Sequence, residues 1–173
     1  TYTINAKVID IAGNASTASG NFITTVDTTA PNAPSITSVT DDVGTITGTL
    51  TSGGRTDDTN LTVRVSLSST NAVAGDTVQL YNSTTALGSA YTLLAADITN
   101  GYANVATGTL TNGTTYTINA KVIDIAGNAS AASGNFTATV DTTAPSAPSI
   151  TSVTDDVGPI TGTLTAGGRT DDT

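Results

Sequence analysis

The apolar positions of this chain fall into short alternating segments that are separated by turn sequences. In Leu61–Ser68, apolar residues occupy every second position, and Thr, Arg and Ser fill the positions between them. Thr115–Asp124 alternates in the same way, with Tyr, Ile, Ala and Val on one face. Because successive side chains of a strand point to opposite faces, this alternation predicts half-buried β-strands. We expect further strands at Ser35–Thr40, Thr77–Tyr81, Leu87–Leu93, Tyr102–Leu110 and Ser133–Val140, and a short one within 45–51.

The composition supports an all-β fold. Thr accounts for 39 of the 173 residues, and β-branched side chains fit the pleated surface of a sheet. All 14 acidic residues are Asp, which favours turns and caps, and the chain has no Glu, which favours helices. Strands separated by turn sequences every eight to twelve residues or so are typical of a β-sandwich. Since the chain has only 5 Tyr, 2 Phe and no Trp, we expect a core of aliphatic side chains.

Tyr116 is the aromatic residue with the most informative position. It opens a predicted strand directly after the turn sequence Leu-Thr-Asn-Gly-Thr. Immunoglobulin-like domains place a tyrosine corner at such a position, where the phenol hydroxyl bonds to the backbone a few residues upstream. The alternative is an inward-facing aromatic side chain that only fills the core. Both interpretations keep the sandwich.

A long internal repeat organises the chain. Residues 1–59 return as residues 115–173, with 53 of 59 positions identical at an offset of 114. A period of this length suits one whole domain per repeat rather than a solenoid unit. The six positions that differ are Thr17/Ala131, Ile23/Thr137, Thr24/Ala138, Asn32/Ser146, Thr45/Pro159 and Ser52/Ala166.

The repeat leads to a prediction of tandem immunoglobulin-like β-sandwich domains joined end to end. We expect the last strands of one repeat in 1–30, a complete repeat in 31–144 and the first part of the next repeat in 145–173. The Pro-containing segments VDTTAPNAP and VDTTAPSAP are interpreted as linkers, because proline favours extended backbone. The chain is therefore interpreted as an interior window of a longer protein.

The composition also argues against several kinds of chemistry. The chain has no Cys and no His, so it has no disulfide framework, no thiolate metal site and no imidazole base. A formal net charge of −9 argues against a nucleic-acid surface, which needs clustered Lys and Arg. No apolar run approaches the roughly 18 residues of a membrane-spanning helix. We expect no enzymatic activity, no nucleic-acid partner and no membrane insertion of this segment.

Several linked motifs carry a resemblance to a known family. Four motifs follow one another along the chain, and together they cover it. They are VDTTAPxAP, TSVTDDVGxITGxLTxGGRTDDT, AVAGDTVQLYNSTTALGSAYTLLAADITNGYANV and INAKVIDIAGNAS. This set resembles the bacterial immunoglobulin-like repeats of giant RTX-type and biofilm-associated surface adhesins. The resemblance implies extracellular stalk modules, on the bacterial surface or in a secreted matrix, that are stiffened by calcium at or near domain junctions. The glycine-rich nonapeptide calcium roll of such adhesins does not occur in this sequence.

The aspartates are concentrated in loops. Twelve of the 14 lie in four motifs that each occur twice, DIAGN, VDTTAP, TDDVG and GRTDDT. In a seven-stranded immunoglobulin topology, TDDVG and GRTDDT lie beside the linker that leaves the domain, and DIAGN lies beside the linker that precedes it. We therefore expect five carboxylates to converge at one junction, those of Asp41, Asp42, Asp57, Asp58 and Asp141.

Such a group of carboxylates suits a divalent cation. Each close like-charge pair costs about 1 kcal/mol or more near a protein surface. Calcium reverses this by taking six to eight or so oxygen ligands, whereas magnesium needs stricter geometry and zinc prefers nitrogen and sulfur. We therefore expect Ca²⁺ ligands among Asp10, Asp27, Asp41, Asp42, Asp57, Asp58, Asp124, Asn128, Asp141, Asp155, Asp156, Asp171 and Asp172.

Loop aspartates also have an ordinary interpretation, since they cap turns and keep surfaces soluble without any metal. We interpret Asp76 as a turn residue and Asp97 as a cap, because both lie outside the four motifs. Asn128 is first the turn-forming residue of Ala-Gly-Asn and only second a direct ligand.

The function predicted from these features is mechanical. A stalk of such domains would hold an adhesive tip away from a cell surface and so serve cell adhesion and biofilm formation. Its partners would be neighbouring repeats of the same chain, with lateral self-association as a further option. Two alternatives stay open, a self-assembling extracellular fibre and a module that binds carbohydrate or a host protein. For the module, Arg55, Arg64 and a few Tyr are the available anchors.

Overall fold

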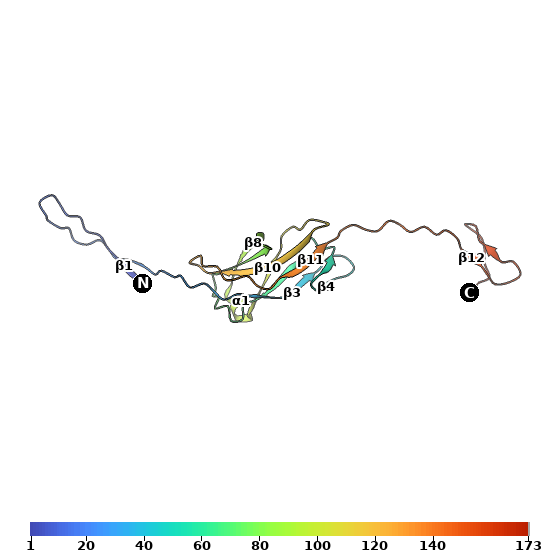
Figure 1. The fold of residues 1–173 in the computed structure, drawn as a ribbon, viewed down its shortest axis with the longest axis horizontal. Coiled ribbons are helices and arrows are strands. Elements are labelled where there is room, and N and C mark those ends of the chain that lie inside the picture. The colour runs from blue at the N-terminus through green and yellow to red at the C-terminus, as the bar shows by residue number, and fades with distance from the viewer. Residues whose placement is uncertain (173) are drawn as a thin grey trace. The chain divides into compact units, whose positions relative to one another are not determined.

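The computed structural model describes residues 1–172, which form β-strands and one short helix (Figure 1). The chain divides into two compact units, Thr1–Thr142 and the part from Thr143 onward. The elements are, in chain order, β1 (Tyr2–Ile4), β2 (Phe22–Thr24), β3 (Ser35–Asp41), β4 (Gly48–Thr49), β5 (Gly54–Thr56), β6 (Thr62–Ser66), β7 (Thr77–Asn82), β8 (Thr85–Thr92), α1 (Ala95–Asn100), β9 (Tyr102–Ala106), β10 (Thr115–Ile123), β11 (Phe136–Val140), β12 (Thr154–Asp155) and β13 (Gly162–Thr163).

Two sheets of the first unit form a β-sandwich. The larger sheet has the strand order β5-β11-β10-β7-β8, and the smaller has the order β4-β3-β6-β9. Neighbouring strands are antiparallel except β5 and β11, which are parallel. Placing β3, β6 and β9 in one sheet and β7, β10 and β11 in the other is how immunoglobulin domains divide their strands. The all-β sandwich expected from the sequence is therefore confirmed, while the tandem arrangement stays a prediction.

The core lies between the two sheets and is aliphatic, as the composition predicts. Alternate residues of β6, β7 and β10 point into it, which is the direct result of their period-2 patterns. Burial of these side chains is the main force that holds the sheets together. The largest fully buried apolar side chains are Leu61, Leu80, Leu93, Ile118, Val39, Val63, Val65, Val78, Val105, Val122 and Val140.

Tyr116 forms the predicted tyrosine corner. Its side chain is buried in the core cluster, and its hydroxyl oxygen accepts a hydrogen bond of 2.8 Å from the backbone N–H of Thr111. The two interpretations of this residue therefore both hold, because the ring fills the core while the hydroxyl fixes the turn before β10.

Two elements were missed by sequence reasoning. The strand β5 lies in a segment that reads as a polar loop, and it is held by parallel pairing with β11. The helix α1 begins after Leu94, where Oδ2 of Asp97 accepts a 2.8 Å hydrogen bond from the Leu94 N–H. The role of Asp97 as a cap is thus confirmed, although the helix itself was not predicted.

Strand β11 is shorter than the predicted strand that starts at Ser133. Serine hydroxyls replace the backbone acceptors of the ladder in this segment, while the N–H groups of Ser130 and Ser133 still donate to the backbone oxygens of Val122 and Ala120. The Ser133 hydroxyl accepts from the N–H of Ala120 at 2.9 Å, and the Ser130 hydroxyl accepts from the N–H of Val122 at 3.0 Å. The chain thus stays beside β10 without strand geometry until Phe136.

Both copies of the repeated sequence form the same local hairpins. Tyr2 pairs with Thr24 in β1–β2, and the corresponding residues Tyr116 and Ala138 pair in β10–β11. Strands β12 and β13 likewise repeat the pairing of β3 with β4. Apolar side chains of the first copy are exposed, however, including 62% of Tyr2. Within residues 1–172, no helix is long and apolar enough to span a bilayer.

Candidate functional site

Several carboxylates lie at one end of the sandwich, because three strands end there. Strand β3 ends at Asp41, and the last paired residues of β5 and β11 are Thr56 and Val140. The residues that follow these strand ends are therefore neighbours. Asp41, Asp57 and Asp141 line one shallow hollow beside the loop 45–50. The strand register thus brings TDDVG, GRTDDT and the following linker to the same end.

Thr56 is the centre of a hydrogen-bond network at this end. Its hydroxyl donates to Oδ2 of Asp41 at 2.6 Å and accepts from the N–H of Asp58 at 3.0 Å. The other Asp41 oxygen accepts from the Val43 N–H at 3.0 Å. Asp41 is buried, with 3% of its surface exposed. Burial of a carboxylate is tolerated only where its oxygens are satisfied in this way.

Asp58 is buried as well and also organises backbone. Its Oδ1 accepts from the N–H of Asn60 at 2.7 Å, and its Oδ2 accepts a longer bond of 3.5 Å from the N–H of Asp42. Asp42 and Asp57 are exposed. The carboxylates of Asp41 and Asp58 therefore hold the loops, while Asp42 and Asp57 stay accessible to solvent.

A glycine shapes the loop between these carboxylates. Gly44 has a φ of +79°, and a Cβ at this position would collide with the carboxylate of Asp57. Gly158 has a φ of +88° and meets Asp171 in the same manner. Only glycine adopts this backbone region without strain. The glycine of TDDVG therefore lets the second aspartate motif approach the first.

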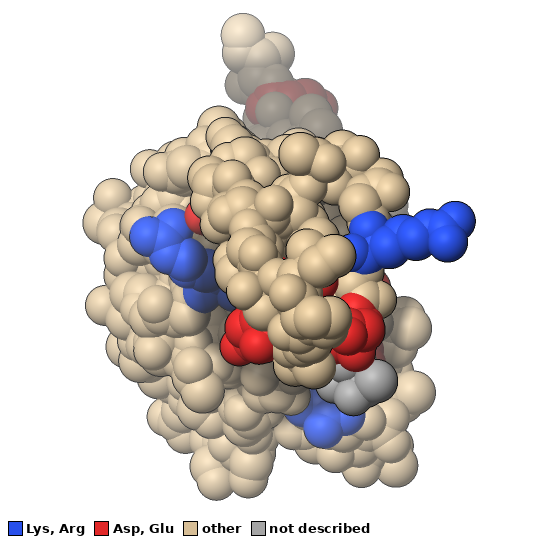
Figure 2. All heavy atoms as spheres, turned by 90° about the vertical axis from the view of Figure 1, so that its right-hand side faces the viewer, with Lys and Arg blue, Asp and Glu red and all other residues tan. Residues whose placement is uncertain are grey.

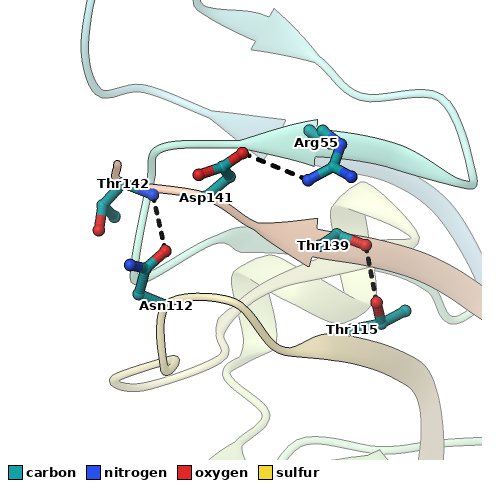
Figure 3. A network of polar contacts seen from close by, with 6 residues as sticks. All are labelled: Arg55, Asn112, Thr115, Thr139, Asp141 and Thr142. Atoms are coloured by element: carbon teal, nitrogen blue, oxygen red, sulfur yellow. Dashed lines mark hydrogen bonds and ion pairs between the residues drawn. The ribbon is translucent and has the colours of Figure 1, made fainter. Parts of the chain in front are cut away.

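Asp141 has a cationic neighbour. Its Oδ2 lies 3.2 Å from Nη1 of Arg55, as Figure 3 shows. Both side chains are exposed, so this ion pair contributes little stability. Close by, the side-chain oxygen of Asn112 accepts from the N–H of Thr142 at 2.9 Å, which fixes the start of the linker. A cation at the hollow would compete with Arg55 for Asp141.

The unit from Thr143 onward contains a compact group of three carboxylates. One oxygen from each of Asp155, Asp171 and Asp172 lies within 4.8 Å of the others, so the three could hold a metal ion. Oδ1 of Asp172 is buried and has no hydrogen-bond partner among residues 1–172. An all-oxygen donor set with one unsatisfied buried oxygen fits a hard cation. Asp156 is exposed beside this group. Figure 2 shows both acidic and basic side chains on the face that it draws.

The opposite end of the sandwich presents a second set of acidic residues. Thr77 and Ile123 are paired where β7 begins and β10 ends, so Asp76 and Asp124 lie at the same end. Both line a hollow together with Asp27 and the linker 29–31. DIAGN therefore lies beside the preceding linker, as the topology predicts.

Asp76 is the residue of this set that sequence reasoning missed. It does hold a turn, since its Oδ2 accepts from the Val73 N–H at 2.9 Å. Its Oδ1 also accepts from the Ile125 N–H at 3.2 Å, which joins the turn to the DIAGN loop. The available signal was its position directly before a strand, but only the pairing of β7 with β10 makes it a neighbour of Asp124.

Asn128 acts first as a turn former. Its backbone N–H and its side-chain amide each donate to one Asp124 oxygen, both at 2.8 Å. The amide of Asn128 also donates to the backbone oxygen of Asp27 at 3.2 Å, which ties the linker to the loop. The side-chain bond from Asn128 is the largest cause that lowers the pKa of Asp124. Asn14 lowers the pKa of Asp10 in the same way in the first copy.

We expect Asn128→Ala to raise the pKa of Asp124 toward its ordinary value of 3.8. A folded-state pKa below the unfolded value stabilises the fold above the unfolded pKa, and this stabilisation is lost as the pH falls through the folded pKa. The variant should therefore be less stable than the parent chain above the unfolded-state pKa, and it should lose less stability than the parent as the pH falls through the acid range. Carboxyl ¹³C shifts measured through a pH titration test this prediction.

The matched control for this titration is Asn14→Ala. It should raise the pKa of Asp10 and leave Asp124 unchanged, because each amide bonds to the aspartate of its own loop. An unaltered Asp124 titration in Asn128→Ala would contradict the assigned cause.

All the predicted site residues except Asp10 thus fall into three groups. Asp41, Asp42, Asp57, Asp58 and Asp141 lie at one end of the sandwich, and Asp27, Asp124 and Asn128 lie at the other. Asp155, Asp171 and Asp172 form the compact group, with Asp156 exposed beside it, while Asp10 lies in an exposed loop of the first copy. Whether any of them binds calcium stays a prediction. No family model, curated protein or solved structure matches the chain.

Proposed function

We propose that this chain is a segment of an extracellular stalk on a bacterial surface, built from tandem immunoglobulin-like domains whose junctions bind calcium. The stalk would hold an adhesive tip away from the cell and so serve adhesion and biofilm formation. Calcium would stiffen the junctions by bridging the carboxylates at the ends of successive domains.

The observation that carries the proposal is the group of Asp155, Asp171 and Asp172. Three carboxylate oxygens within 4.8 Å repel one another in the absence of a counter-ion. The buried Oδ1 of Asp172 is also unsatisfied among the described residues, so that a hydrogen-bond donor or a cation would stabilise it. A divalent ion with oxygen ligands removes both costs.

The position of acidic residues at both ends of the sandwich supports a role at junctions. Asp41, Asp57 and Asp141 line the hollow at one end, and Asp27, Asp76 and Asp124 line the hollow at the other. Domains stacked end to end would bring two such hollows together. The added carboxylates would complete the six to eight or so oxygens that calcium takes.

The linker before the sandwich also supports a stiff arrangement. The backbone N–H and the side-chain amide of Asn32 donate to the backbone oxygens of Thr70 and Ser69, both at 2.9 Å. Pro31 and Pro34 flank Asn32 and restrict the backbone dihedrals of this segment. The linker is therefore fastened to the sandwich rather than free, which limits bending at this point.

The test measures calcium binding and shape on the full chain. Isothermal titration with CaCl₂ should give dissociation constants of about 10⁻⁴–10⁻³ M, the range of extracellular calcium modules. At a concentration tenfold above the dissociation constant, calcium should stabilise the folded state by about 1.4 kcal/mol. Small-angle scattering should show a narrower distribution of long distances with calcium than with chelator.

Variants separate specific binding from a general charge effect. Asp155→Asn, Asp171→Asn and Asp172→Asn combined should abolish one binding event in the titration. Asp97→Asn, which removes an acidic group outside the loops, should leave it intact. No heat of binding, with identical scattering and melting in calcium and chelator, would overturn the calcium proposal.

A further inference from the structure

Three of the six differences between the two sequence copies fall on one contact. Ile23/Thr137 and Thr24/Ala138 are neighbours on the last strand of the repeat, and Ser52/Ala166 lies in the turn before the short strand beside it. In the complete sandwich the residues at this contact are Ser52, Thr137 and Ala138, which we name the pairing patch. It joins the first part of the repeat to its last strand.

The outer side of the pairing patch is polar. The Gly53 N–H donates to the backbone oxygen of Thr137 at 2.8 Å. The Thr137 N–H in turn donates to the Ser52 hydroxyl at 3.1 Å, and the two side-chain hydroxyls lie 3.3 Å apart. The Ser52 side chain thus extends the parallel β5–β11 ladder by one bond beyond the point where its own backbone turns away.

The inner side of the pairing patch is tightly packed. Ala138 has 1% of its surface exposed and lies in register with Tyr116 on one side and Gly54 on the other. The first copy has Thr24 at this position. A threonine here would put two more heavy atoms, one of them a hydroxyl, into a site filled by a methyl group. Overpacking and an unpaired buried hydroxyl are both destabilising.

We propose that the pairing patch makes a repeat select its own last strand over the near-identical strand of a neighbouring repeat. The fitting strand has a hydroxyl facing Ser52 and a methyl group facing the core. The first-copy strand offers Ile23 and Thr24 instead, and so fits neither side. A repeat that has alanine in place of Ser52, as at Ala166, should accept an apolar residue opposite it.

The need for such selection follows from the tandem arrangement, on which this inference rests. Neighbouring domains of near-identical sequence are prone to exchange strands, because the same strand fits every copy. The hairpin β1–β2 has the pairing register of β10–β11. Among the side chains of the two strands, only those that differ can therefore favour one pairing over the other.

A double-mutant cycle in the full chain tests the polar side. Ser52→Ala should lower the folding equilibrium constant about threefold to fivefold, the effect of one lost hydrogen bond. Thr137→Ile alone should lower it less, since the Ser52 hydroxyl loses its contact with the Thr137 hydroxyl but still accepts from the Thr137 N–H. The folding constant of the double variant should be clearly larger than the value obtained by multiplying the two single losses. Purely multiplicative losses would overturn the polar half of the proposal.

A matched pair of substitutions tests the packed side. Ala138→Thr, which installs the first-copy residue, should lower the folding constant at least about tenfold. Ala131→Thr also installs a first-copy residue, but at an exposed position, and should change the constant by less than about twofold. Equal effects of the two variants would overturn the role of Ala138.

Cysteine pairs then report which strand is seated. Thr139 is in register with Arg55, and Thr25 is its counterpart in the first copy. Oxidation of Arg55→Cys with Thr139→Cys should give a crosslink, while Arg55→Cys with Thr25→Cys should give almost none. Exchanging the patch residues, with Ile23→Thr, Thr24→Ala, Thr137→Ile and Ala138→Thr, should raise the second crosslink and lower the first.

The result that would overturn strand selection is an unchanged ratio of the two crosslinks after the exchange. All of these measurements are made in chelator. A failure here is therefore independent of the calcium titration, and a failure of calcium binding would leave the pairing patch unaffected.

Discussion

Ile118→Ala is expected to lower the free energy of unfolding by about 2–5 kcal/mol, the usual cost of truncating a fully buried aliphatic side chain. Ile118 has no exposed surface and lies in the middle of β10, between β7 and β11. Removing its outer methyl and methylene groups leaves a cavity, because the two sheets cannot close around it without moving the whole strand. Urea denaturation followed by circular dichroism measures the change.

The repeated sequence supplies the control for this substitution. Ile4 occupies the same place in the first copy, with the same neighbours in sequence, but 53% of its surface is exposed. Ile4→Ala should therefore change the free energy of unfolding by less than about 0.5 kcal/mol. Equal losses in the two variants would show that the first copy also contributes a strand to a core, contrary to the sandwich described above.

The pair illustrates what local sequence can and cannot decide. Period-2 alternation correctly placed β3, β6, β7 and β10, because each of these strands buries one face and exposes the other. The same alternation occurs in residues 1–10, where the apolar side chains are exposed. Period-2 alternation therefore indicates which face of a strand can be buried. Whether that face is buried depends on partner strands from distant parts of the chain.

Strand β5 could not be predicted for the related reason that its signal is not local. Gly54, Arg55 and Thr56 have no apolar alternation and read as part of a polar loop. They become a strand through parallel pairing with β11, more than eighty residues away. Parallel pairing of this kind leaves no turn sequence between the two strands from which it could be read.

The candidate site could likewise be predicted from the sequence only in part. The convergence of loops at each end follows from a sandwich topology, and so the sequence was sufficient to place Asp41 near Asp57 and Asp141. Which carboxylates accept hydrogen bonds from the loops and which stay exposed was not predictable. It depends on which oxygens the Thr56 hydroxyl and nearby backbone N–H groups reach, as they do at Asp41 and Asp58.

The hydrogen bonds that the Asp41 carboxylate accepts give the second prediction. Asp41→Ala should lower the free energy of unfolding by about 2–4 kcal/mol in chelator, because one buried donor and one part-buried donor lose their acceptor. These donors are the Thr56 hydroxyl at 2.6 Å and the Val43 N–H at 3.0 Å. Asp41→Asn keeps an acceptor oxygen and should cost less. Chemical denaturation with and without calcium measures each variant.

The neighbouring aspartate separates the structural contribution from the metal. Asp42 has the same charge and is exposed, so Asp42→Ala should change stability by less than about 0.5 kcal/mol in chelator. If the loop binds calcium, each aspartate that ligates the ion should also reduce the stabilisation gained on adding it. A loss for Asp41→Ala that appears only in calcium would show that its carboxylate serves the ion alone. A loss already present in chelator would show that the carboxylate holds the loop in place before any cation arrives.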